Sequence, residues 1–234
     1  MKSCFHLYNY LLLSLVCLLS SADAGFCSPK STQNLCDAKW TNKQGLILLA
    51  ANSSLQPVPY AQAEELFKEK KYDEVIRLLS GPTSAEPANF KLNILLAKAQ
   101  IEKCAILKAK GDKSYKSLIQ QPYRKGRTLH KIDETRPEPY YIVARSFLIN
   151  NRPYRAEKTI KKALYFSPAN AEYFVVLGDA YKAQAEQSVD SDAGELFSKA
   201  KDIYEKAIKA TKDKSEELRS IVEERIREVS EKIK

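Results

Sequence analysis

The sequence is poor in the residues that build most catalytic and cofactor sites. Its 234 residues include only two histidines, five cysteines, seven glycines, one methionine and one tryptophan. Glycine is too sparse for a phosphate-cradling loop, and no such motif occurs. No Cys-x-x-Cys pair is present, which excludes a thioredoxin-like redox pair and covalent haem attachment. The composition therefore argues against a cofactor-dependent enzyme.

The few histidines and cysteines are also poorly placed for catalysis. His6 falls in an N-terminal leader, so His130 is the one remaining histidine, and it sits beside Lys131 in a basic stretch typical of a helix surface. Cys104 falls in a helical run, where a buried thiol is the usual outcome. A nucleophile and base would have to be built from these two residues, and their spacing supports none. We predict no enzyme activity, no cofactor and no metal site.

Residues 1–24 have the pattern of a secretory signal. Lys2 precedes an apolar run from Tyr10 to Leu19, and Ala22-Asp23-Ala24 forms a small-x-small cleavage site. The run is shorter than the roughly 20 apolar residues that a membrane helix needs. We therefore predict cleavage after Ala24 and a periplasmic or extracellular protein, with a retained anchor as the alternative.

The next segment, 25–59, is predicted to be an N-terminal extension. Two of its residues, Cys27 and Cys36, lie close together in a turn-rich stretch. In an oxidising compartment, a disulfide between them is the simplest interpretation.

The second half of the chain contains an internal repeat. Tyr140 and Phe174 begin similar patterns 34 residues apart. In each pattern, small residues fall where two helices must approach closely, and large ones fill the space beside them. The first pattern comprises Tyr140, Val143, Ala144, Phe147, Ala156, Ile160 and Ala163, ending at Pro168, and the second comprises Phe174, Leu177, Gly178, Tyr181, Ala200, Tyr204 and Ala207.

This layout resembles the tetratricopeptide repeat (TPR) family, most closely between Pro137 and Ala210. The resemblance implies an all-α, right-handed solenoid of helical hairpins. About four hairpins are expected over 60–212. The second is irregular because Pro122 and Gly126 fall in its second helix, and the fourth has helices extended to meet at Ser188–Ala193.

A final helix, 213–234, is predicted to cap the array. Asp213 and Glu216 form a potential capping box at its start. Its apolar stripe would cover the last hairpin while charged residues face water. The stripe consists of Leu218, Ile221, Val222, Ile226, Val229 and Ile233.

The family resemblance also implies a groove that binds an extended peptide or a helix. On the two best-matching units, the groove-facing positions would be Tyr141, Arg145, Leu148, Val175, Asp179 and Lys182. Arg145 and Lys182 could clamp a carboxylate, and Tyr141 could supply an apolar wall.

The net charge of +9 is concentrated in one stretch, where ten basic residues face two acidic ones between Lys98 and Lys131. Such a cluster could hold an acidic protein, anionic lipid headgroups or an anionic polymer, or it could be a solvated face. Nucleic acid ranks last, because an exported protein seldom meets it. The candidate basic patch consists of Lys108, Lys110, Lys113, Lys116, Arg124, Lys125 and Arg127.

Two functions follow from these features. The first is a non-enzymatic scaffold or adaptor that binds a protein partner in a cell-envelope or extracellular assembly, with oligomers possible. The alternative is a solute-binding module that works beside a transporter. An enclosed pocket near Tyr123, Tyr141 and Tyr181 would favour the alternative, and an open trough would favour the scaffold.

Overall fold

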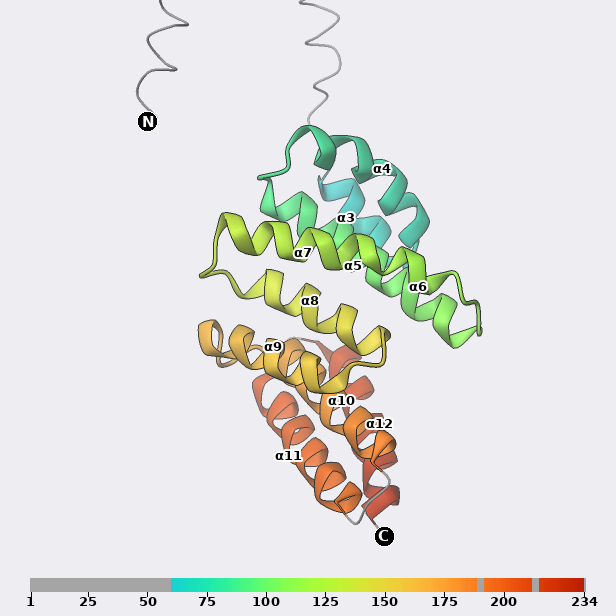
Figure 1. Ribbon diagram of the computed structural model, residues 1–234, viewed down its shortest axis with the longest axis vertical. Helices are drawn as coiled ribbons and strands as arrows, with labels where there is room; N and C mark the ends of the chain where they lie inside the picture. Colours follow the sequence, from blue (N-terminus) through green and yellow to red (C-terminus); the bar gives the residue numbers. More distant parts are fainter. Residues whose placement is uncertain (1–59, 189–191, 212–214, 234) are drawn as a thin grey trace, which may run out of the picture. The chain divides into compact units, whose positions relative to one another are not determined.

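The computed structural model describes residues 60–188, 192–211 and 215–233, and these are helical, with no strand among them (Figure 1). This confirms the predicted fold class, an all-α array of hairpins closed by a C-terminal helix. The predicted leader and disulfide fall outside the described residues. The helices are α3 (Tyr60–Lys68), α4 (Tyr72–Ala85), α5 (Phe90–Ala109), α6 (Tyr115–Leu118), α7 (Gln120–Ile132), α8 (Pro137–Ile149), α9 (Pro153–Phe166), α10 (Ala171–Gln187), α11 (Ala193–Thr211) and α12 (Glu216–Ile233).

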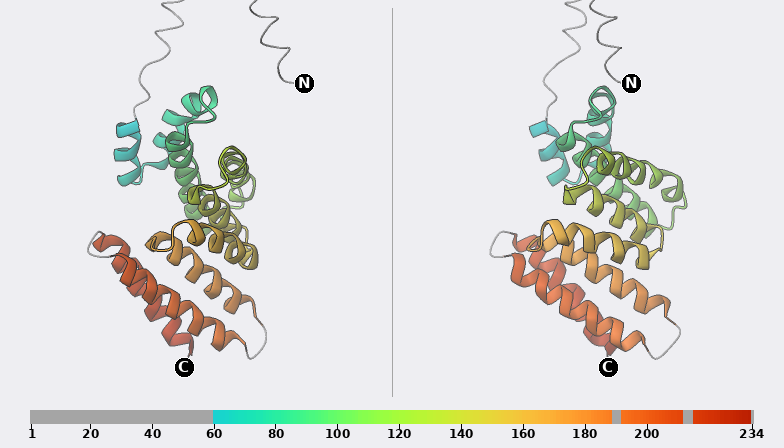
Figure 2. Two further views of the ribbon diagram at one scale, coloured as in Figure 1. Left: turned by 90° about the vertical axis from the view of Figure 1, so that its left-hand side faces the viewer. Right: turned by 60° about the vertical axis from the view of Figure 1, so that its left-hand side comes forward.

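Successive helices pack against one another in chain order. Hairpins α3/α4, α8/α9 and α10/α11 each pair neighbours, and the first helices α5, α8 and α10 also contact one another. In Figure 1, α7, α8 and α9 lie one below the other, and Figure 2 shows α10, α11 and α12 side by side. Each hairpin therefore buries its apolar stripe against the next, as a repeat array requires.

Three turns reverse the chain by the same backbone device. Lys70, Gly111 and Asn151 have φ of 60°, 75° and 55°, the left-handed conformation that ends many helices. In the α8/α9 turn, the Arg152 amide donates to the Phe147 carbonyl at 2.9 Å, and Pro153 then starts α9 with the φ that proline prefers. Asn and Gly tolerate this conformation well. At Lys70 the conformation is strained, because its Cβ comes close to the following carbonyl oxygen.

Two of these turns lie at the same distance in sequence from the start of the next hairpin. Nineteen residues separate Lys70 from Asn89, and nineteen separate Asn151 from Asn170. Both asparagines are N-caps, whose side-chain oxygens accept from the Leu92 amide at 3.3 Å and the Tyr173 amide at 3.4 Å. The degenerate first hairpin therefore shares the register of the third.

Gly178 marks the closest helix crossing in the second half of the chain. A Cβ placed there would lie 2.4 Å from Cε1 of Tyr204, a residue that is fully buried on α11. Ala144, Ala156, Ala163, Ala200 and Ala207 are likewise fully buried. Small residues thus stand where α8 meets α9 and where α10 meets α11, and the large ring fills the gap that glycine leaves.

The irregular residues of the second hairpin have a clear role in the fold. Pro122 is the third residue of α7, where its missing N–H has no carbonyl partner within the helix. Gly126 is a second close crossing, because a Cβ there would lie 2.9 Å from Cγ2 of Val143 on α8. The sequence predicts an irregular second hairpin at these residues, and in the structure α7 runs continuously through both of them.

The capping helix α12 differs from its predicted pattern in two ways. Ser215 caps it, since its Oγ accepts from the Leu218 amide at 3.2 Å, and Asp213 lies outside the described residues. Val222 and Val229 are fully buried, but Ile221 and Ile233 are 39% and 42% exposed. A straight helix over one neighbour buries a narrower stripe than the sequence suggests.

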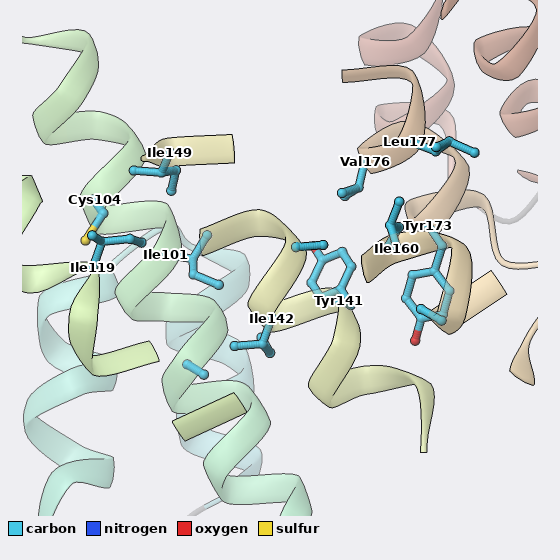
Figure 3. Close-up of a cluster of buried hydrophobic side chains, with 13 residues drawn as sticks. Ile101, Cys104, Ile119, Tyr141, Ile142, Ile149, Ile160, Tyr173, Val176 and Leu177 are labelled. Carbon is cyan, nitrogen blue, oxygen red and sulfur yellow. The ribbon is translucent and has the colours of Figure 1, made fainter. Parts of the chain in front are cut away.

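The central core runs through α8 from one side to the other. Figure 3 shows Ile101, Cys104 and Ile119 on one side of the cluster and Tyr173, Val176 and Leu177 on the other. Because α8 faces both groups, it connects the second hairpin to the fourth. The position of α8 thus decides how the first helices line up to form a surface.

Candidate functional site

A trough of about 750 Å³ follows the first helices of successive hairpins. Its walls come from α5, α8, α10 and α12, so it crosses several repeats rather than lying inside one. Its apolar lining consists of Ala105, Ala109, Leu148, Ile149, Ala183 and Ile221. Its charged lining consists of Lys108, Arg145, Asp179, Lys182, Glu186, Glu224, Arg225 and Glu228, four positive and four negative residues.

Arg145 joins the second and third hairpins across the trough. Its guanidinium lies 2.8 Å from Glu102 on α5 and donates to the Tyr141 hydroxyl at 3.4 Å. Burial works to lower the pKa of Arg145, but Tyr141 and Glu102 raise it more, so the group stays charged. This cation is therefore already neutralised within the chain.

Asp179 joins the fourth hairpin to the capping helix. Its carboxylate accepts from the Tyr204 hydroxyl at 2.8 Å and forms an ion pair with Arg225 of α12. One turn further along α10, Lys182 pairs with Glu228, which is also on α12. Burial, and then Asp179, raise the pKa of Tyr204, which holds the phenol in its protonated, donating form.

Four of the six predicted groove residues line this trough: Arg145, Leu148, Asp179 and Lys182. Tyr141 does not, because it is 7% exposed and packs its ring against Tyr173 in the core, with centroids 5.5 Å apart. Val175, also expected to face the groove, is buried in the cluster around Tyr204. Neither residue is available as an apolar wall.

Arg145 and Lys182, the residues expected to clamp a carboxylate of the partner, are both engaged within the chain. Arg145 and Lys182 each have a carboxylate partner already, contributed by Glu102 and Glu228. These partners lie 43 and 46 residues away in the chain, so the pairing follows from the tertiary fold and not from any local pattern. A partner's carboxylate would have to displace an internal one.

The residues of the predicted basic patch do not share one surface. Lys108 lines the trough, where its Nζ donates to the Ile149 carbonyl at 2.9 Å at the end of α8. Lys125 is half-buried and donates to Asn93 at 2.6 Å. Burial lowers the pKa of both lysines. Lys110, Lys113, Lys116, Arg124 and Arg127 are exposed along the end of α5, the following turn, α6 and α7.

Cys104 and His130 occupy packing positions. Cys104 is 1% exposed, and burial raises the pKa of its thiol to about 11, so the nucleophilic thiolate is scarce near neutral pH. His130 is not simply a surface residue: its ring lies 4.7 Å from that of Tyr140, and its Nδ1 is buried with no hydrogen-bond partner in the described structure. Cys104 lies in the central cluster and His130 packs on Tyr140, and no hydrogen bond joins the two side chains in the described residues.

The Cys104 environment predicts slow alkylation in the folded chain. Its pKa is raised from 9.0 to about 11, so at pH 8 the thiolate is about 100-fold scarcer than in the unfolded chain. We expect iodoacetamide to label Cys104 about 100-fold more slowly than it does in urea. Mass spectrometry of the peptide containing Cys104 measures the two rates, and equal rates would contradict the buried position.

The tyrosines that would mark an enclosed solute pocket are engaged in packing. Tyr123 packs on Phe147 with centroids 5.5 Å apart, and the Tyr181 hydroxyl donates to Glu157 at 3.2 Å. With Tyr141 in the core and the large hollow an open trough, the solute-binding alternative finds no support. Within the described residues, no cluster of metal-binding side chains occurs, and no helix combines the length and apolarity needed to cross a membrane.

Comparison with known proteins gives one kind of match. No family model matches the chain, and no curated protein matches it. Two solved structures are similar: a crystal structure of MamA, 19% identical, covers 73% of this chain and 93% of its own with a TM-score of 0.41. A second, of MamA protein, is 19% identical and covers 74% and 89% with a TM-score of 0.42.

Proposed function

We propose that this chain is a TPR-family scaffold that binds a segment of a partner protein in the trough lined by α5, α8, α10 and α12. The observation that supports it most is the continuity of the trough across successive first helices, which gives an extended site rather than a closed pocket. A scaffold needs no reacting group, in keeping with the packing roles of Cys104 and His130. Its task is to hold the partner in a fixed place.

The lining of the trough favours an amphipathic helix as the bound segment. Leu148, Ala183 and Ile221 offer an apolar strip. The charges beside the strip are largely paired within the chain, as for Arg145 with Glu102 and Asp179 with Arg225. A strongly charged ligand gains little from neutralised groups, whereas an apolar stripe at helical spacing gains from burial.

Ile221 and Ile233 provide a matched test of the trough. They lie on the same helix and are 39% and 42% exposed, but only Ile221 lines the trough. We expect Ile221→Glu to weaken partner capture by about tenfold or more, because it places a charge on the apolar strip, whereas Ile233→Glu leaves capture unchanged. The measurement is quantitative affinity purification from native extract after mild crosslinking.

The control for this pair is the free energy of unfolding of each variant. Both side chains are partly exposed, so each variant should unfold within about 0.5 kcal/mol of the parent. Equal loss of partner in both variants, or no loss in either, would count against the trough as the binding site.

We propose in addition that the chain is exported and works in the periplasm or outside the cell. The pattern of residues 1–24 supports this, and a disulfide between Cys27 and Cys36 is expected in that compartment. N-terminal sequencing of the native protein tests it: a chain beginning at Gly25 in the envelope fraction supports export, and a chain retained in the cytoplasm with its first residues intact contradicts it.

A further inference from the structure

The face of α8 opposite the trough carries a second hollow. This groove, called here the α7–α9 groove, has a volume of about 220 Å³, and Figure 1 shows α8 lying between α7 and α9. Arg127 of α7 and Lys162 of α9 contribute to its two walls, and the floor is formed by α8. The floor residues are Pro139, Tyr140, Val143 and Phe147.

Two exposed cations, Arg127 and Lys162, line this groove, and four more stand on the same two helices. Six basic side chains are exposed on α7 and α9, and in the described part of the chain none of them forms an ion pair: Arg124, Arg127, Lys131, Arg155, Lys158 and Lys162. Helix α7 contains no acidic residue. The only one in α9, Glu157, is engaged by Lys161, Tyr181 and Gln184.

This is the reverse of the charge arrangement in the trough. There, Arg145, Lys182 and Arg225 are each paired with a carboxylate of the chain. Around the α7–α9 groove, the cations have nothing within the described chain to neutralise them, so their field acts on whatever approaches. We propose that the α7–α9 groove binds an extended acidic polypeptide segment, rich in aspartate and glutamate, from a partner protein.

The ring geometry favours a polypeptide over single-stranded nucleic acid. The ring of Tyr140 has His130 4.7 Å away and Phe166 stacked 5.8 Å away, and Phe147 is packed by Tyr123. Rings already engaged with neighbours offer poor platforms for stacking bases, and such stacking contributes about 1–3 kcal/mol per base to sequence-independent binding of single strands. Carboxylates, by contrast, need only the cations on the two walls.

The distribution of exposed apolar groups disfavours a lipid surface. A membrane-binding helix presents a continuous apolar face to the bilayer. On α9 the exposed aromatics Tyr154 and Tyr165 stand near the two ends, and the lysines Lys158 and Lys162 stand between them. At about 1.5 Å per residue, the 14 residues of α9 span about 21 Å, the length of about six residues of an extended peptide.

The test uses the full-length chain and a fluorescein-labelled peptide of about eight alternating aspartates and glutamates, followed by fluorescence anisotropy. We expect saturable binding that weakens as salt increases. The double reversal Arg127→Glu with Lys162→Glu, one residue from each wall of the groove, should weaken binding by about tenfold or more. The matched double reversal Lys206→Glu with Lys209→Glu, at exposed positions of α11, changes the net charge equally and should alter binding by less than about twofold.

Three results would overturn the proposal. Equal loss in the two double variants would show that net charge alone acts. Absence of saturable binding by the parent would remove the site. A single-stranded DNA oligomer or phosphatidylserine vesicles could bind more tightly than the acidic peptide at equal charge concentration. That result would assign the surface to another class of partner. Unfolding curves of both double variants show that each remains folded, and Ile221→Glu should leave peptide binding unchanged, since it alters only the trough.

Discussion

Replacing Gly178 with alanine is expected to destabilise the folded chain by about 1–2 kcal/mol, and replacing it with valine by about 3 kcal/mol or more. A Cβ at this position would lie 2.4 Å and 2.6 Å from Cε1 and Cδ1 of Tyr204. The ring cannot retreat, because Tyr204 is fully buried and its hydroxyl is held by Asp179. The better helix propensity of alanine, worth about 1 kcal/mol, offsets only part of this clash.

Two comparisons make this prediction specific. Gly194 is also helical, but a Cβ there would meet nothing within 4 Å, so Gly194→Ala should not destabilise the chain and should gain up to about 1 kcal/mol from helix propensity. In a Tyr204→Leu background the ring is gone, and the cost of Gly178→Ala should fall. Urea unfolding followed by circular dichroism measures the parent, the three single variants and the Gly178→Ala/Tyr204→Leu double variant. A Gly178→Ala variant as stable as the parent would contradict the close crossing of α10 and α11.

Replacing Asp179 with alanine should be the most damaging change at the trough, with a loss of about 2–3 kcal/mol. Two donors depend on this carboxylate, the hydroxyl of Tyr204 and the guanidinium of Arg225. The hydroxyl belongs to a fully buried residue, so losing its acceptor costs most, while the pair with Arg225, whose side chain is 30% exposed, contributes less. Asp179→Asn keeps an acceptor oxygen and should lose about 1 kcal/mol.

The same network gives a pH dependence. The pKa of Tyr204 is raised above its ordinary value of 10.0, chiefly by burial and next by Asp179. Above pH 10, the unfolded chain releases this proton while the folded chain keeps it, so stability is full below pH 10 and falls as the pH rises. Thermal unfolding between pH 8 and 11 measures the slope. Asp202→Ala, at an exposed position of α11, is the control and should match the parent.

Much of the fold could be predicted from the sequence because packing positions recur with the repeat. Gly178 and Ala144 were expected at helix crossings, and both are buried there. Gly126 occupies the same kind of position, but together with Pro122 it predicted only an irregular second hairpin. A proline in the first turn of a helix is tolerated, and the sequence pattern did not show that α7 begins just before Pro122.

The site could be predicted less well because its charges are paired through the tertiary fold. Arg145 meets Glu102, and Asp179 meets Arg225, across 43 and 46 residues. No local pattern indicates such pairs, so the trough cations looked available when they are not. Lys108 and Lys125 also belonged to a basic run in the sequence, but in the structure Lys108 bonds α8 of the next hairpin and Lys125 bonds α5 within its own hairpin.

The two faces of α8 suggest a division of labour. Arg145 and Leu148 face the trough, while Tyr140 and Phe147 form part of the floor of the α7–α9 groove. One face offers an apolar strip with neutralised charges, and the other offers cations without partners. A scaffold of this kind could hold an amphipathic helix and an acidic segment at the same time, since the two sites share no lining residue.

The most direct test of the trough is site-specific photocrosslinking in the native cell. A photoreactive phenylalanine analogue would replace Ala183, which lines the trough, and separately Ile233, which lies on α12 outside it. We predict one discrete adduct from position 183, with a partner peptide identified by mass spectrometry, and none from position 233. Adducts of equal yield from both positions, or none from position 183, would contradict the assignment of the trough as the partner-binding surface.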